Sequence, residues 1–137
     1  MDLLRLPFNQ LIGVKAADKE PYLLMLPALT QYQNHLQSVH AGALFTLAEG
    51  TAAQFLLNAF TDVENIIPVV RKVEVKFSKQ AFGAIYGKAH LHQCTEEEIR
   101  IGLNQKGRIS FSVLASIHNQ DDTQVFAGVF EWFVTKN

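Results

Sequence analysis

One long apolar run limits what this chain can fold into. Between His40 and Phe60, Glu49 is the only residue with a permanent charge. The part from about Ala41 to Asn58 has no proline and is rich in alanine and leucine, which predicts one long helix. Its apolar residues surround nearly the whole circumference, and such a helix is buried on most sides. A carboxylate at Glu49 is therefore costly to bury unless something stabilises or uses it.

The bulk composition excludes several classes of protein. A length of 137 residues fits one domain with one core, which we assign to residues 1–137. The single cysteine, Cys94, excludes an internal disulfide and fits a reducing compartment. A formal net charge of −1 gives no reason to expect nucleic acid or an acidic membrane as the main partner. Only 18% of the residues are charged, which suggests that part of the surface is buried against copies of the same chain.

We expect neither a membrane-spanning segment nor a signal peptide. The run from Ala41 to Phe60 is interrupted by polar residues, and no other stretch approaches the ~20 apolar residues that a membrane helix needs. The N-terminus "MDLLRLPFNQ" has an early aspartate and no long apolar core. The expected location is the cytoplasm.

Prolines and glycines divide the first part of the chain into short elements. The stretch "LLRLPFNQLIG" predicts a short amphipathic helix that ends near Gly13. Residues 22–29 predict a strand, and Pro27 places it at a sheet edge or a bulge.

The second half of the chain has the alternating pattern of half-buried strands. We expect strands beginning near residue 69 and at 84–92, 109–117 and 124–134. Between them, Thr95 and Glu98 match a capping box and favour a short surface helix, with a polar hairpin as the alternative. A run of strands around one helix is typical of the α+β class. The simplest packing wraps a curved antiparallel sheet around the helix, and a second copy could extend its edge strands.

Several residues suited to chemistry gather at the start of the long helix: Asn34, His40, Ala41, Gly42 and Glu49. The N–H groups of a first helical turn lack partners within the helix and can hold a polarised carbonyl or an oxyanion. Ala41 and Gly42 are small enough for a ligand to approach their backbone. Burial should raise the pKa of Glu49, which suits a general base or a nucleophile. The set is consistent with acyl transfer.

Each of these residues also has an ordinary structural interpretation. His40 could be a helix cap, and Asn34 a turn residue. Glu49 could pair with a buried Lys or Arg, and the small residues could only permit close helix packing. Because one helix presents all of them together, a functional site remains as plausible as these separate interpretations.

The spacing N-x5-H-A-G-A-L-x4-E, from Asn34 to Glu49, resembles the hotdog-fold acyl-CoA thioesterases. The resemblance is to the phenylacetic-acid-degradation (PaaI-like) and 4-hydroxybenzoyl-CoA thioesterase branch, whose members carry Asn, then His-Gly-Gly, then Asp or Glu on the central helix. It extends from about Tyr22 to Val134, because the order of the elements also matches. It implies the hotdog fold, a curved antiparallel sheet around one central helix.

The resemblance also implies roles for individual residues. Glu49 corresponds to the carboxylate that activates water or attacks the thioester, and the N–H of Ala41, beside Gly42, to the donor that polarises the carbonyl. His40 and Asn34 correspond to residues that orient the thioester. In "KFSKQAFG", Ser78 falls where the family has a Ser or Thr that positions the water.

The family implies a site between two subunits of a homodimer or a dimer of dimers. This chain departs from its pattern in two ways. Ala41 replaces the first glycine, which could narrow the pocket. A glutamate replaces the commoner aspartate at Glu49, and its extra methylene leaves open whether it acts as base or nucleophile.

Other polar residues have weaker interpretations. Four cations near the second strand form either a solvated face or a contact with coenzyme A phosphates: Arg71, Lys72, Lys76 and Lys79. Of these we assign Lys72 and Lys79 to the phosphates. His90 and His92 alternate on a strand, but no acidic or thiol group completes a metal site, so we expect neither a metal nor a cofactor besides substrate coenzyme A.

Three functions follow from the sequence. The first is hydrolysis of an acyl-CoA to a free acid and coenzyme A. The second is hydration or dehydration of an acyl thioester by a hotdog enzyme, although the "HF-x-x-x-P-x-x-P-G" type of stretch is absent. The third is a non-catalytic module that binds acyl-CoA. The sequence does not identify the acyl group, nor whether coenzyme A or an acyl-carrier protein delivers it.

Overall fold

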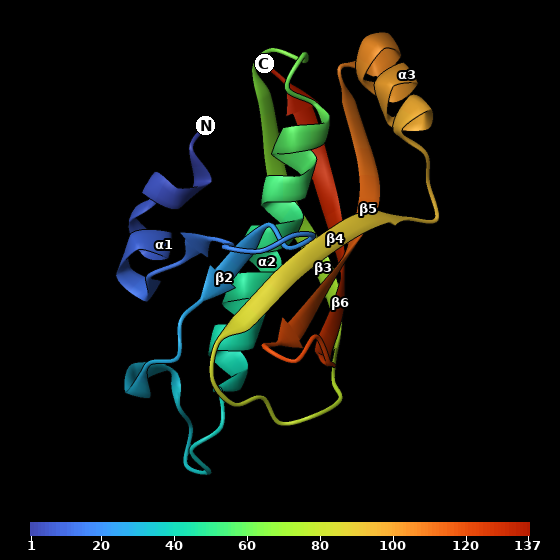
Figure 1. Cartoon of the computed structure of the whole chain (residues 1–137). Helices are drawn as coiled ribbons and strands as arrows, with labels where there is room; N and C mark the ends of the chain where they lie inside the picture. Colours follow the sequence, from blue (N-terminus) through green and yellow to red (C-terminus); the bar gives the residue numbers. More distant parts are fainter.

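A six-stranded antiparallel sheet curves around one long helix in the computed structural model, which describes residues 1–137 (Figure 1). The helices are α1 (Pro7–Ile12), α2 (Ala41–Ala59) and α3 (Glu96–Lys106), with 3₁₀ turns η1 (Leu3–Arg5) and η2 (Thr30–Tyr32). The strands are β1 (Lys15–Ala16), β2 (Leu24–Leu26), β3 (Ile66–Phe77), β4 (Ile85–His92), β5 (Arg108–Asn119) and β6 (Gln124–Lys136). Their order in the sheet is β1-β2-β4-β5-β6-β3, and every neighbouring pair is antiparallel.

Helix α2 lies against the concave face of this sheet (Figure 1). Its N-cap is His40, and its buried residues are Leu44, Leu47, Ala48, Gly50, Thr51, Ala52, Ala53 and Leu56. Except for Gly50 and Thr51, they join inward-facing side chains of β4, β5 and β6 in one core cluster of 25 buried residues. This confirms the predicted α+β class and the hotdog arrangement of a sheet around a central helix.

Most expected elements are present, with two differences near the N-terminus. The strand expected at residues 22–29 is only Leu24–Leu26, because Pro27 lacks the N–H that a continuing ladder would need. The N-terminal helix is divided into η1 and α1, and Pro7 occupies its first position. It ends at Gly13 in the left-handed conformation, as expected.

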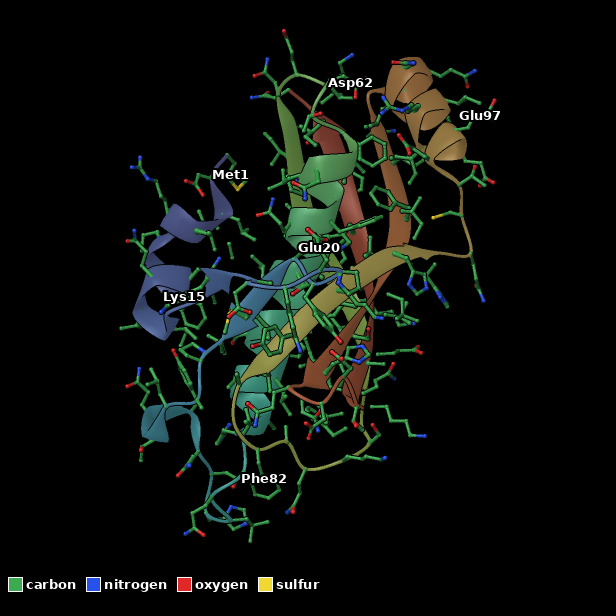
Figure 2. All side chains as sticks on the ribbon, in the orientation of Figure 1. Met1, Lys15, Glu20, Asp62, Phe82 and Glu97 are labelled. Atoms are coloured by element: carbon green, nitrogen blue, oxygen red, sulfur yellow. The ribbon has the colours of Figure 1, made fainter.

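The segment between β4 and β5 is a helix and not a hairpin. The Thr95 hydroxyl accepts a hydrogen bond from the N–H of Glu98 at 3.2 Å, and Gly107 ends α3 in the left-handed conformation. Arg100 ties α3 to the end of α2, with two hydrogen bonds to Asp62 and one to the carbonyl of Ala59. Figure 2 labels Asp62 and Glu97 at this end of the molecule.

Strand β3 is an edge strand with apolar side chains in solvent. It pairs with β6 along its length and has no neighbour on its other side. The exposed fractions are 45% for Ile67, 52% for Val69, 39% for Val75 and 49% for Phe77. A long apolar edge of this kind is normally covered by another strand.

No helix is long and apolar enough to cross a membrane.

Candidate active site

The loop before α2 is organised around the side chain of Asn34. Its Oδ1 accepts hydrogen bonds from the N–H of Leu36 at 2.9 Å, the N–H of Ser38 at 3.1 Å and the Ser38 hydroxyl at 3.1 Å. The two backbone donors fix which end of the amide is the oxygen. The Nδ2 group forms no hydrogen bond within the protein and is left as a donor.

His40 caps α2 with its imidazole. Nδ1 accepts a hydrogen bond from the N–H of Gly42 at 2.8 Å, and the His40 carbonyl accepts from the N–H groups of Ala43 and Leu44. In the neutral imidazole the proton must then lie on Nε2, which becomes a donor for other groups. The expectation that Gly42 leaves room for a ligand stays a prediction, and the glycine also serves the helix cap. A Cβ at Gly42 would lie 3.1 Å from His40 Nδ1, so the missing side chain makes room for the imidazole.

These contacts leave one free donor in the first turn of α2. The N–H groups of Gly42, Ala43 and Leu44 all have acceptors, whereas that of Ala41 has none. It sits at the positive end of a nineteen-residue helix, where a partial negative charge is stabilised. The N–H of Ala41 is therefore the donor available to a carbonyl oxygen.

A cleft of about 360 Å³ opens beside this donor. Its lining comes from the loop, from the start of α2 and from the segment after β3, as follows: Asn34, Ser38, Val39, Ala41, Leu44, Phe77, Ser78, Lys79, Gln80 and Ala81. A backbone hydrogen bond from Val39 N to Ala81 O at 2.8 Å holds the two walls together, and another from Ser78 N to Val125 O at 3.0 Å fixes the segment after β3 to β6. Figure 2 labels Phe82, the next residue, at the end of the molecule where α2 begins.

Glu49 lies farther along α2 and does not line this cleft. Its side chain is half-buried and forms neither a hydrogen bond nor an ion pair, so the structure gives it no Lys or Arg partner. Burial raises the pKa of the Glu49 carboxyl above its usual value. Eight residues separate it from Ala41, about 12 Å along the helix axis.

The structure thus brings some of the expected site residues together and separates others. Asn34, Ala41, Ser78 and Lys79 line one cleft, and His40 and Gly42 adjoin it through the helix cap. Lys72 does not line the cleft and pairs with Glu74 at 3.4 Å on an exposed surface. Ser38, which is not among the residues expected from the sequence, is 2% exposed and its hydroxyl holds Asn34. An Asn followed four residues later by Ser is the only sequence signal of that turn.

Comparisons with solved structures define the class of this fold. A Pseudomonas aeruginosa protein of unknown function, described as a probable thioesterase, superposes with a TM-score of 0.81 at 25% identity, over 98% of this chain and 91% of that chain. A variant of a thioesterase enzyme from Staphylococcus aureus gives 0.69 at 10% identity, over 95% and 99%. A Bacillus halodurans protein solved with CoA gives 0.64 at 19% identity, over 81% and 69%. The fold is that of the hotdog thioesterase superfamily.

A family model matches residues 12–134 and is described as a domain of unknown function, DUF4442. The chain belongs to this family. No curated protein sequence matches it. The membership of the PaaI-like branch stays a prediction, because none of these similarities distinguishes one branch of the superfamily from another.

Proposed function

We propose that this protein is a thioester hydrolase that cleaves an acyl-CoA to a free acid and coenzyme A. The observation that carries the proposal is the unpaired, half-buried carboxylate of Glu49 on the same helix as the free N–H of Ala41. An unpartnered ionisable group that is partly removed from water is costly for stability, and such groups concentrate at functional sites.

The two groups must come from different subunits. An attacking group and an oxyanion donor both lie within about 3 Å of the reacting atoms, whereas Glu49 and Ala41 of one chain are about 12 Å apart along α2. A two-fold symmetric dimer solves this problem, because it brings each helix start close to the carboxylate of the partner. The exposed apolar edge of β3 is the surface that we assign to the dimer contact.

In the proposed reaction, the thioester carbonyl oxygen accepts a hydrogen bond from the N–H of Ala41. Asn34 Nδ2 and His40 Nε2 orient the thioester. The Glu49 carboxylate of the partner subunit removes a proton from a water molecule held near Ser78, and the resulting hydroxide adds to the carbonyl carbon. The oxyanion on the former carbonyl oxygen is stabilised by the same N–H. Its collapse breaks the carbon–sulfur bond, and the leaving thiolate takes the proton from Glu49.

Glu49 could instead attack the carbonyl carbon itself, break the carbon–sulfur bond with loss of the coenzyme A thiolate, and form an anhydride that water then hydrolyses. A single turnover in ¹⁸O-labelled water detects the anhydride when water opens it at the Glu49 carbonyl carbon. Label in the Glu49 side chain would show the anhydride, whereas label only in the acid product is expected if Glu49 acts as a base.

Lys79 supports coenzyme A as the leaving group, because it lines the cleft as an exposed cation. The phosphates of coenzyme A are the expected partners of such a cation, and Lys72 could contribute at longer range. The Bacillus halodurans protein with the same fold was solved with CoA. We place the reaction in the cytoplasm, where acyl-CoA is made and used.

A free-thiol release assay across acyl-CoAs of increasing length, and with a phenylacetyl group, tests the proposal. Wild type should release thiol, and Glu49→Gln should lower kcat at least 100-fold while remaining folded. A crotonyl thioester that is hydrated without thiol release would favour a hydratase. Tight binding of acyl-CoA without turnover of any substrate would overturn the proposal in favour of a binding module.

A further inference from the structure

We propose that Tyr32 is a positioning residue that connects the N-terminal helix α1 to the start of α2. It would hold His40, and with it the N–H of Ala41, in the geometry that the reaction uses. This inference rests on the proposed function for its catalytic consequence, although the geometry of the connection is independent of it.

The side chain of Tyr32 is anchored at the end of α1. It is 8% exposed, and its hydroxyl donates a hydrogen bond to the carbonyl of Ile12, one of the last carbonyls of that helix. Gly13 follows with a φ of +92°, and a Cβ there would lie 2.6 Å from the Tyr32 hydroxyl oxygen. The chain therefore needs glycine at this position for two reasons, the left-handed backbone and the space for the hydroxyl.

The backbone of Tyr32 is joined directly to His40 at the start of α2. Its carbonyl accepts a hydrogen bond from the N–H of His40 at 2.8 Å, and an antiparallel bridge between Gln33 and Val39 follows. Asn34 lies two residues after Tyr32, and Ala41 directly follows His40. A shift of Tyr32 would thus displace the wall of the cleft that carries the two proposed orienting groups, Asn34 and His40.

Such a shift should affect the reaction more than binding. The Ala41 N–H has to meet the oxyanion that develops on the carbonyl oxygen, and misplacement by about 1 Å can cost on the order of 100-fold in rate. Lys79, which we assign to coenzyme A, lies in the segment after β3, and Tyr32 does not line the cleft. Loss of the anchor should therefore lower kcat while KM changes little.

The experiment uses four variants of the full chain. Tyr32→Phe removes only the hydroxyl, and Gly13→Ala introduces the clash with it. In the double variant Gly13→Ala with Tyr32→Phe, the nearest atom to the new Cβ is Tyr32 Cζ at 4.0 Å, an ordinary contact. Gly107→Ala is the matched control, because Gly107 is also left-handed, with a φ of +69°, but a Cβ there meets nothing within 4 Å.

Two readouts are compared, acyl-CoA turnover and the ¹⁵N chemical shifts of the His40 imidazole. We expect Tyr32→Phe to lower kcat about tenfold with KM within about twofold, and Gly13→Ala to lower it further. The double variant should keep the kcat of Tyr32→Phe, since the clash is gone, and lose only the stability that the left-handed backbone costs an alanine, as Gly107→Ala does. The His40 shifts should move in both single variants and stay unchanged in Gly107→Ala.

Unchanged kcat and unchanged His40 shifts in Tyr32→Phe would overturn the positioning role. Additive losses in the double variant would also overturn it, because they would assign the Gly13→Ala effect to backbone strain alone. If Gly13→Ala fails to fold, the kcat of Tyr32→Phe and its His40 chemical shifts still test the positioning role of Tyr32. If the wild type hydrolyses no thioester, the proposed function fails, and the His40 shifts alone test the connection.

Discussion

The imidazole of His40 folds over the start of α2, and its Nδ1 accepts the N–H of Gly42 at 2.8 Å. This contact uses the N–H of Gly42, and the His40 carbonyl accepts hydrogen bonds from the N–H groups of Ala43 and Leu44. Only the N–H of Ala41 remains free. A histidine cap therefore both begins the helix and selects which backbone group can meet a ligand.

Replacement of Ala41 by proline should delete this donor with little change to the helix. Ala41 is the first helical residue, where proline is favoured, and His40, at φ −62° and ψ 141°, already has a conformation that suits the residue before a proline. Loss of one oxyanion donor typically costs about 100- to 1,000-fold in kcat. We expect a loss of this size in thiol release, with an unchanged unfolding midpoint. Ala41→Gly keeps the N–H, and equal losses in both variants would show that the donor is not used.

Replacement of Gly42 by alanine should disturb the cap. The new Cβ would lie 3.1 Å from His40 Nδ1 and 3.5 Å from Cε1, so the imidazole has to move. We expect roughly a tenfold loss of kcat, because the first-turn geometry changes. Gly50→Ala in the same helix is the control, since its nearest neighbour, Leu24 Cδ1, is 3.4 Å away. That control should keep activity and gain roughly 0.5–1 kcal/mol of stability. An active Gly42→Ala would contradict the role of the cap.

Removal of the charge at Glu49 should stabilise the fold while it abolishes turnover. Burial raises the pKa of this carboxyl in the folded state, so its ionised form destabilises the protein. The contribution of Glu49 to stability should therefore be greatest below about pH 4.5 and be lost as the pH rises through the raised pKa. Glu49→Gln should have a higher melting temperature than wild type at pH 8 and the same melting temperature at pH 4. The exposed Glu64→Gln serves as the control, and a lower midpoint for Glu49→Gln at pH 8 would contradict the argument.

The long elements could be predicted from sequence because their signals are local and repeated. Helix α2 follows from a run of good helix formers, and α3 from a threonine cap that forms the expected hydrogen bond. Glu49 stood out as one charge in an apolar helix. The strand predicted at residues 22–29 is too long, because the apolar side chains continue past Pro27, where the hydrogen-bond ladder of the strand ends.

The details of the site could not be predicted, because they depend on contacts between segments. The burial of Ser38 under Asn34 requires a loop with Gln37 in the left-handed region, which no sequence pattern indicates. The Tyr32 anchor joins two segments twenty residues apart. The sequence assigns Lys79 to coenzyme A, but its position in the cleft depends on the hydrogen bonds from the N–H groups of Ser78 and Lys79 to the carbonyl of Val125.

His118 gives a second pH dependence, unrelated to the site. It is buried beside Ser116, Tyr22 and Lys88, and this burial lowers the pKa of its imidazole. The hydrogen bond to the Asp122 carbonyl raises this pKa, and the charge of Lys88 lowers it, both by less than burial does. As the pH falls below about 6.5, His118 is protonated in the unfolded chain before it is protonated in the folded chain. Stability is therefore lost between about pH 6.5 and the lowered pKa of His118 in the folded state. His118→Gln should lose less stability than wild type between pH 7 and pH 5 in denaturant titrations. His90→Gln, at an exposed position, should behave as wild type.

Mixed dimers test whether each site is shared between subunits. Glu49→Ala and Ala41→Pro should each be inactive alone. When they are unfolded and refolded together, a heterodimer contains one site with both defects and one with neither. Random pairing makes about half of the dimers mixed, so about a quarter of the wild-type activity should return. Sedimentation velocity confirms that dimers have formed. Dimers without any recovered activity would show that Glu49 and Ala41 do not serve one site across the β3 edge.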